Sequence, residues 1–305
     1  MKHLFIINPM AGKNRDKRAL EDRIRSLDLD SEIVCTTHPG HARELTAAAG
    51  RAGLPTRVYA CGGDGTLNEV VNGAAGFDHL AITNVPVGTG NDFLKIFSPD
   101  YRRNFSDLEA LSRGPQAAFD LMDCNGTLGI GIICAGVDAR IAADVHHYKS
   151  LPLVTGIGAY ILSLIVNVLF KGITQPMEIH MGDLDWSGET AVLCVCNGRY
   201  YGGGFMPVGE AMPDDQILDM LMVPKVSRAT FFRLVGKYAA GQYKQYPDLI
   251  RDFHGQGVTF RADRPITVVV DGEVMRDTEF TVRLSDKKVN FFYPGNTGYQ
   301  PAASV

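Results

Sequence analysis

The first third of the chain alternates short apolar runs with longer segments whose apolar side chains recur every three or four positions. Such short runs predict buried strands, and the longer periodic segments predict amphipathic helices. The predicted strands are residues 2–8, 31–35, 57–61 and 80–85, and the predicted helices are 15–27, 41–53 and a segment that starts shortly after residue 61. Because strands and helices alternate, we expect a parallel sheet with right-handed crossovers.

The pattern changes near Gly114-Pro115, where strands become frequent and helices rare. The predicted strands are 118–124, 128–134, 177–181, 190–197, 217–223, 257–261, 266–270, 278–284 and 288–293. Asn125-Gly126 between the first two is typical of a tight hairpin turn. One amphipathic helix, 228–243, interrupts the strands, with Ser227 as its expected N-cap. This pattern predicts a mainly antiparallel β-sandwich or an open barrel.

The predicted organisation is therefore an α/β nucleotide-binding domain with a parallel sheet, followed by a β-sandwich domain. We place the first domain at residues 1–116 and the second at residues 117–285. Residues 286–305 form a C-terminal strand and tail that is free to return to the first domain.

Composition describes an ordinary folded chain. A length of 305 residues suits two domains, and a net charge of −4 gives no reason to expect a nucleic-acid partner. The six cysteines show no Cys-x-x-Cys spacing, which predicts reduced thiols and a cytoplasmic location. No signal-peptide pattern precedes the first apolar run.

Residues 150–170 carry no charged side chain, and a stretch of this length could span a bilayer. However, a proline and several glycines interrupt it, and Ala159, Ser163 and Asn167 form a small and polar stripe at helical spacing. We therefore expect a helix that is buried at a domain junction or lies on the membrane surface, rather than a membrane span.

A glycine-rich segment follows the predicted strand 57–61. It reads Gly62-Gly63-Asp64-Gly65-Thr66-Leu67-Asn68 and leads into a helical pattern. Backbone N–H groups at a helix N-terminus bind anions, and we expect Thr66 to cap this helix. Asp64 would repel a bare phosphate, so it predicts a Mg²⁺ ion between carboxylate and phosphate. The alternative is an ordinary strand-to-helix turn.

Two further polar loops follow predicted strands. They read Asn8-Pro9-Met10-Ala11-Gly12-Lys13 and Pro86-Val87-Gly88-Thr89-Gly90-Asn91-Asp92-Phe93. In an open parallel sheet such loops gather at the carboxyl edge, where ligands bind. We expect the active site in the cleft between the two domains.

Together the three loops resemble the catalytic domain of the diacylglycerol kinase, sphingosine kinase and bacterial lipid kinase family. The resemblance covers nearly the whole chain and implies ATP as phosphate donor, Mg²⁺ as cofactor and a lipid hydroxyl as acceptor. It implies that ATP is bound by Asn8, Thr37, Gly62, Gly63, Asp64, Gly65, Thr66, Leu67, Asn68 and Thr89. Lys13 is a further candidate near the phosphates, and a plain turn hydroxyl is the alternative for Thr37.

The same resemblance implies a structural Mg²⁺ in the segment 212–219. Its ligands would be the Asp215 carboxylate and the backbone carbonyls of Met212 and Ile217. Where the family usually has glycine, this chain has Gln216, and a positive φ is costly for glutamine. An acidic turn without metal is the alternative.

Asp271-Gly272-Glu273 lies between two predicted strands, and an Asp-Gly pair is typical of a hairpin turn. The resemblance implies that Asp271 is the catalytic base that takes the proton of the acceptor hydroxyl. On that hypothesis, replacing Asp271 by asparagine lowers kcat by roughly 10²–10⁴ and hardly changes stability.

Two other functions are left open. A NAD kinase would share the Gly-Gly-Asp-Gly loop, but it would not explain the second glycine loop or the Asp271 turn. A non-catalytic regulator that binds nucleotide or lipid would not need both Asp64 and Asp271.

The lipid kinase hypothesis predicts a lipid substrate at the membrane and peripheral association with the inner membrane face; a homodimer is left open. Basic residues with only Asp248 as an acidic neighbour mark the segment 225–251 as a membrane-facing candidate. They are Lys225, Arg228, Arg233, Lys237, Lys244 and Arg251. The alternative is a solvated helix that packs on the sandwich.

Overall fold

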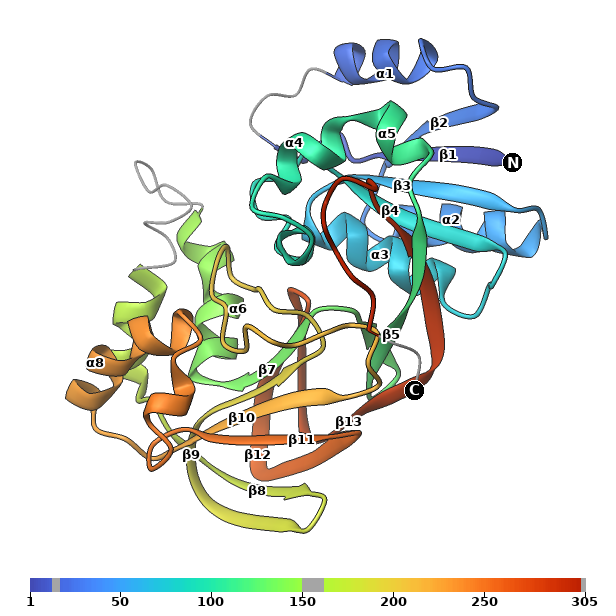
Figure 1. Cartoon of the computed structure of the whole chain (residues 1–305). Coiled ribbons are helices and arrows are strands. Elements are labelled where there is room, and N and C mark those ends of the chain that lie inside the picture. The colour runs from blue at the N-terminus through green and yellow to red at the C-terminus, as the bar shows by residue number, and fades with distance from the viewer. Residues whose placement is uncertain (13–16, 150–161, 303–305) are drawn as a thin grey trace.

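The computed structural model describes residues 1–12, 17–149 and 162–302 (Figure 1). Its strands form a 13-stranded sheet that continues from an α/β first half into a strand-rich second half. The main path has the order β11-β10-β9-β7-β12-β13-β4-β3-β1-β2. The predicted combination of an α/β domain with a mainly antiparallel second domain is thus confirmed.

The first half is a parallel sheet covered on both faces by helices (Figure 1). Its strands are β1 (Lys2–Ile7), β2 (Ser31–Cys35), β3 (Thr56–Gly62) and β4 (Leu80–Pro86). Its helices are α1 (Lys17–Arg25), α2 (His41–Arg51), α3 (Asp64–Ala74), η1 (Phe93–Ile96), α4 (Tyr101–Ser106) and α5 (Leu108–Ser112). The apolar runs of β1, β3 and β4 are almost fully buried, because helices cover both faces of the parallel sheet, whereas the edge strand β2 is half-buried.

The second half is a set of mainly antiparallel strands. They are β5 (Gln116–Cys124), β6 (Thr127–Gly129), β7 (Ile132–Gly136), β8 (Gln175–Met181), β9 (Leu184–Cys196), β10 (Leu218–Pro224), β11 (Arg251–Gly255), β12 (Gly257–Val270) and β13 (Glu273–Phe292). One face encloses a core that includes Ile179, Phe260 and Phe280. A second apolar cluster joins the strands to the helical segments α6 (Val137–Lys149), η2 (Asn167–Lys171), α8 (Arg228–Ala239) and η3 (Tyr243–Gln245).

Strand β13 belongs to both halves. It first pairs with β12, then with β5, and its end at Asn290 and Phe291 pairs in parallel with β4. The Phe291 ring stacks on Phe119 of β5 at 5.5 Å and contacts Phe93 of η1 at 5.3 Å between ring centroids. This aromatic contact anchors η1, and with it the end of the loop that follows β4.

Several elements differ from the sequence-based expectation. The predicted strand 128–134 is two strands, β6 and β7, because residues 130 and 131 leave the ladder. Helix α6 and strand β11 were not predicted, and α8 ends at Ala239 rather than residue 243. The predicted runs 257–261 and 266–270 are one strand with a register shift. The Ser227 cap is confirmed, since its side chain accepts the Thr230 N–H.

The uncharged stretch 150–170 is described only from residue 162 onward, so Ala159 lies outside the described residues. Ser163 and Asn167 are buried, and Ser163 Oγ donates to the Ile141 carbonyl at 2.8 Å. The polar stripe therefore packs on α6, as expected for its described part. Within the described ranges, no helix has both the length and the apolar character to cross a membrane.

Candidate functional site

The glycine loop between β3 and α3 lies against the loop that follows β4. The N–H groups of Val87 and Gly88 both donate to the Gly62 carbonyl, at 3.2 and 2.9 Å. A Cβ atom at Gly88 would collide with the Gly63 backbone, so this contact needs a glycine. The predicted gathering of the two loops is therefore observed.

Helix α3 begins at Asp64 with Gly63 in the N-cap position and no side-chain cap. The expectation that Thr66 caps this helix is wrong, because Thr66 already lies within the first turn. Its Oγ1 instead accepts a hydrogen bond from Asn8 Nδ2 at 3.0 Å. This bond joins the loop after β1 to the glycine loop, which brings two predicted nucleotide-binding residues together.

The Asp64 carboxylate faces the neighbouring loop. Its Oδ1 accepts the Asp92 N–H at 2.7 Å, and its Oδ2 accepts the Asn91 N–H at 2.9 Å. Burial, and next the charge of Asp92, raise the pKa of Asp64 to about 6, while these N–H donors act against the rise. Asp64 thus holds the two glycine loops together, a role that sequence reasoning missed.

The other predicted nucleotide contacts lie around this centre. Thr37 is exposed, and its N–H donates to His41 Nδ1 at 3.1 Å. Glu69 of α3 accepts the N–H groups of Gly40 and Ala42 at 2.9 and 3.0 Å, which fixes the start of α2 near Thr37. Thr89 is exposed, and Lys13 lies outside the described residues.

Asp271 lies at the turn between β12 and β13, with a left-handed φ of 48°. Its Oδ1 accepts the N–H groups of Gly131 and Ile132 at 3.0 and 2.8 Å. Its Oδ2 accepts those of Ile130 and Gly131 at 2.7 and 3.1 Å. We call this group of three N–H donors the 130–132 nest. It explains why the predicted strand 128–134 breaks, since these N–H groups bind a carboxylate instead of a neighbouring strand.

Asp271 also lies near α3, because the Asn68 side chain lowers the pKa of this carboxylate, and Asn68 Nδ2 donates to the Leu128 carbonyl at 3.4 Å. Burial raises the pKa of Asp271, and the N–H donors of Ile132, Gly131 and Ile130 act in the opposite direction. The structure thus brings Asp271 and Asn68 together across the two halves. Because its oxygens already accept four N–H contacts, a base role requires Asp271 to release one of them.

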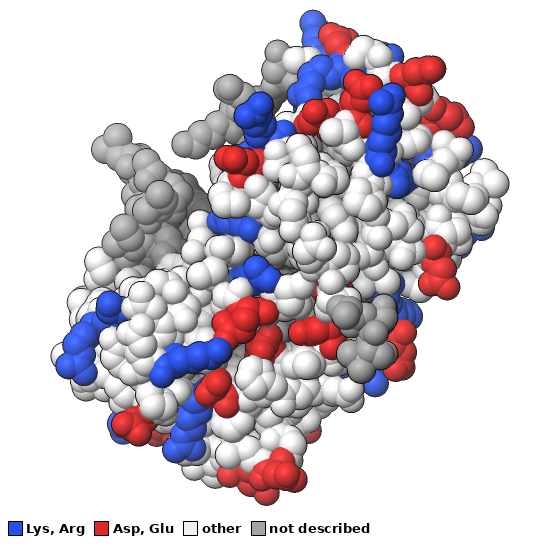
Figure 2. Space-filling model, in the orientation of Figure 1, with Lys and Arg blue, Asp and Glu red and all other residues white. Residues whose placement is uncertain are grey.

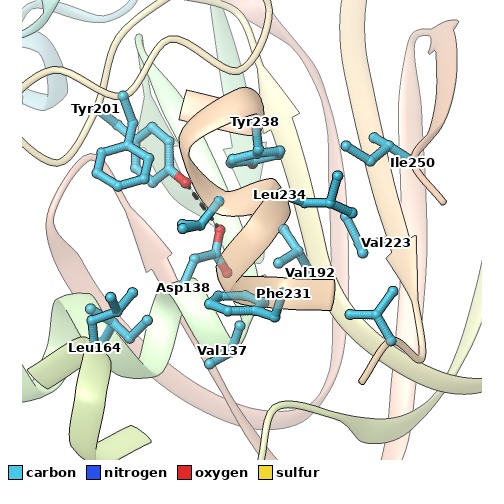
Figure 3. Close-up of a pocket in the computed structure, with 14 residues that line it drawn as sticks. Val137, Asp138, Leu164, Val192, Tyr201, Val223, Phe231, Leu234, Tyr238 and Ile250 are labelled. Atoms are coloured by element: carbon cyan, nitrogen blue, oxygen red, sulfur yellow. Dashed lines mark hydrogen bonds between the residues drawn. The ribbon is translucent and has the colours of Figure 1, made fainter. Parts of the chain in front are cut away.

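A narrow apolar pocket, with a cavity volume of about 40 Å³, lies in the second half, between the strands and helices α6 and α8 (Figure 3). Its lining includes Leu164, Val192, Phe231 and Leu234. Its lining favours an apolar group over a polar one, and its walls must move apart to admit a lipid chain. The sequence analysis did not predict this pocket.

One carboxyl group, Asp138, lies in the wall of this pocket and receives a 3.4 Å hydrogen bond from Tyr201 Oη (Figure 3). Burial raises the pKa of Asp138 to about 7. The buried Tyr238 Oη, also in the wall, has no hydrogen-bond partner among the described residues. Burial, and next the charge of Asp138, raise the pKa of the Cys134 thiol in β7.

The acidic loop 212–219 is anchored on Asp120 of β5. The buried Asp120 carboxylate accepts the Gln216 N–H at 2.8 Å and pairs with Lys288 at 2.8 Å. Gln216 adopts a φ of 61°, the left-handed conformation that glycine would favour. Burial, and then the charges of Asp120 and Asp214, raise the pKa of Asp215, while the Ile217 N–H acts in the opposite direction.

Comparison with known proteins adds two family matches. The description "Diacylglycerol kinase catalytic domain" matches residues 2–124. The description "YegS C-terminal NAD kinase beta sandwich-like domain" matches residues 131–292.

Individual proteins agree with these matches. A Pseudomonas aeruginosa protein named "Probable lipid kinase YegS-like" is 30% identical over 73% of this chain and 72% of its own length. A Pseudomonas fluorescens protein of the same name is 29% identical over 73% of each chain. A crystal structure titled as a diacylglycerol kinase from Bacillus anthracis covers 96% of each chain with a TM-score of 0.69 and 19% identity. This structural likeness concerns the fold.

The 130–132 nest changes the expectation for Asp271→Asn. Asparagine offers one acceptor oxygen and turns an N–H₂ group toward N–H donors, so we expect a loss of about 1–3 kcal/mol in the free energy of unfolding. Urea unfolding measures this loss. The control is Glu273→Gln, two residues further along on an exposed side chain, which should change it by less than about 0.5 kcal/mol. Equal stability of Asp271→Asn and the unmodified protein would contradict the structural role of the nest.

Proposed function

Because the chain belongs to the YegS-like lipid kinase family, whose first half is a diacylglycerol kinase catalytic domain, we propose that it phosphorylates a membrane lipid with ATP. The acceptor is the hydroxyl group of diacylglycerol or a similar lipid. The observation that carries this proposal is the apolar pocket with a carboxyl group in its wall, next to the strand whose N–H groups hold Asp271.

The nucleotide would bind on the loops that surround α3. The N-terminus of α3 offers backbone N–H groups and the positive end of a helix dipole to the phosphates. Asn8, Thr66 and Asn68 border this end through their hydrogen bonds, which supports their predicted contacts with ATP. Thr37 and Thr89 are exposed and free to reach the nucleotide from the side.

In the proposed reaction, the lipid oxygen bonds to the γ-phosphorus while the bond from that phosphorus to the β,γ-bridging oxygen breaks, and ADP leaves. The hydroxyl proton passes to a carboxylate, for which we propose Asp271. Asp138 would orient the polar end of the lipid, since it is the carboxyl group that faces the apolar pocket. The pocket excludes water from the acyl part, which favours lipid over a soluble acceptor.

A divalent cation fits two places in this chain. Bound with the nucleotide, Mg²⁺ supplies charge neutralisation for the phosphates. At the loop 212–219, the proposed ligands are the Asp215 carboxylate and the carbonyls of Met212 and Ile217. The left-handed turn at Gln216 and the negative surroundings of Asp215 support this second site. Asp215 Oδ1 accepts the Ile217 N–H at 2.9 Å, which holds the carboxylate in the turn.

The NAD kinase alternative is weakened by the pocket. A NAD molecule presents ribose and amide groups as acceptors, and the lining of this pocket is almost entirely apolar. NAD is therefore included in the assay below as an alternative phosphate acceptor.

We also propose that the second half docks on the inner membrane surface through α8 and η2, from a cytoplasmic location. The two elements touch, since Arg228 Nε donates to the Val168 carbonyl at 2.9 Å. Phe170 is 79% exposed and Phe232 is 41% exposed, and Figure 2 shows basic side chains over α8. Both α8 and the segment 162–166 line the lipid pocket, so this face would bring the membrane next to it.

The structure removes one residue from the predicted basic surface. Lys244 is paired with Glu210, so it offers little attraction to anionic lipid. Arg228, Arg233 and Lys237 of α8 remain, together with Lys225 and Arg251.

A direct assay tests the activity. Purified protein with ATP and Mg²⁺ should phosphorylate diacylglycerol or a related lipid and leave NAD unmodified. Val235→Trp places a large ring in the pocket, so the KM for the lipid should rise by at least about tenfold, roughly 1.4 kcal/mol. The KM for ATP should stay unchanged. Leu54→Trp, at an exposed site in the first half, is the control. Turnover of NAD instead of every lipid tested would refute the proposal.

The metal site is tested by thermal unfolding without nucleotide. Mg²⁺ at about 100 times its Kd should stabilise the protein by about 2.7 kcal/mol through binding to the folded state alone. Asp215→Ala should abolish this shift, whereas Asp183→Ala, at an exposed acid, should keep it. A melting temperature of the unmodified protein that does not respond to Mg²⁺ would exclude the site.

Membrane docking is tested by sedimentation with vesicles. Each basic side chain near anionic lipid contributes about 1 kcal/mol, so reversal of Arg233 and Lys237 to glutamate should weaken binding by at least about 2 kcal/mol. Added salt should weaken it too. Phe170→Ser should weaken binding independently of salt, and Arg18→Glu on α1 serves as control. Equal binding to neutral and anionic vesicles would rule out this mode of docking.

A further inference from the structure

A carboxylate of the first half holds a glycine turn of the second half. Asp92 Oδ2 accepts the Gly203 N–H at 2.7 Å, and its Oδ1 accepts Lys95 Nζ at 2.5 Å. The Asp92 side chain is buried. Three consecutive glycines form the turn, and their φ values of 61°, 89° and 149° are all left-handed. Residues with side chains rarely adopt this backbone, so the glycines set the direction of the donated N–H.

On its other side, Asp92 is bound to the nucleotide loops. Its own N–H donates to Asp64 Oδ1 at 2.7 Å, in the bond that ties the two glycine loops together. One residue is thus fixed through its backbone to the loop before α3 and through its side chain to the turn 202–204. A shift of either partner changes the length or angle of the other bond.

The residues on either side of the glycine turn line the lipid pocket. Tyr201 and Phe205 flank it, pair by backbone hydrogen bonds of 3.0 and 2.9 Å, and both line the pocket. Tyr201 Oη donates to Asp138 in the same wall. The next residue, Met206, donates its N–H to the Ala239 carbonyl at the end of α8 at 2.9 Å. Movement of the turn therefore moves two walls of the pocket.

We propose that the Asp92–Gly203 hydrogen bond couples the two sites, so that nucleotide on the glycine loops and lipid in the pocket each bind more tightly when the other is present. This inference rests on the proposed function of the two sites. The physical reason is that a ligand which orders the turn from one side reduces the conformational entropy that the second ligand has to remove. Asp92 acts here as a positioning residue.

The coupling is measured by calorimetry on the full chain. The probes are a non-hydrolysable ATP analogue with Mg²⁺ and dioctanoylglycerol. We expect each probe to lower the Kd of the other by the same factor, at least about fivefold, because binding coupling is reciprocal. If either probe fails to bind, the proposed function falls and this inference with it. If both probes bind but neither changes the Kd of the other, only the coupling is refuted.

Two variants locate the coupling in one bond. Asp92→Ala removes the acceptor of the Gly203 N–H, so the factor should fall to about one. Lys95→Met removes only the other partner of Asp92 and should keep the factor of the unmodified protein. Loss of coupling in both variants, or its persistence in Asp92→Ala, would overturn the assignment to the Gly203 bond.

Hydrogen exchange on the unmodified protein gives a second measurement, which does not depend on the folding of Asp92→Ala. The ATP analogue alone should slow amide exchange in residues 200–205, and dioctanoylglycerol alone should slow it in residues 88–95. An exchange rate in the glycine turn that is the same with and without nucleotide would refute the coupling.

Discussion

Backbone N–H groups outside helices and ladders need acceptors, and buried or half-buried carboxylates supply them throughout this site. Asp64 accepts two such groups, Glu69 accepts two, Asp120 accepts one together with an ammonium group, and Asp271 accepts three. Each carboxylate lies on one segment and binds another. The loops of the site therefore hold their shape through these acids more than through packing, since polar glycine-rich segments offer little apolar surface.

This arrangement sets the electrostatics of the site. Burial raises the pKa of Asp64 and Asp271, while the N–H donors favour the charged form and limit the rise. Asp138 differs, because its wall is apolar and its pKa rises to about 7. Asp138 also accepts a backbone N–H, that of Ala139 at 2.9 Å, but unlike the loop acids it lies in the wall of an apolar pocket.

The sequence predicts what depends on neighbouring residues and misses what depends on distant ones. The first four strands lie within a residue or two of their predicted ranges, because their apolar runs are continuous and turn residues bound them. The break between β6 and β7 could not be foreseen, since its cause, Asp271, lies about 140 residues further along the chain. Asp138 gave no signal either, because a single acid in the first turn of a helix is common without any functional role. The Thr66 cap failed because Gly63 already ends the extended backbone before α3.

Strand β13 explains why the loops of both halves meet at all. Its two ends are fixed in different places, one beside β12 at the Asp271 turn and the other beside β4 in the parallel sheet. A strand is stiff along its length, so this single element sets the distance between the Asp271 turn and the first sheet. The hydrogen bonds from Asn68 and Asn72 of α3 to the Leu128 carbonyl, at 3.4 and 2.9 Å, form across the same junction. A further contact between the halves runs through Asp92 and a turn of three glycines, whose left-handed φ values favour residues without a side chain. Strand β13 on one side and the glycine turn 202–204 on the other form an arrangement in which ligand binding can bring the two halves closer without disturbing the sheet.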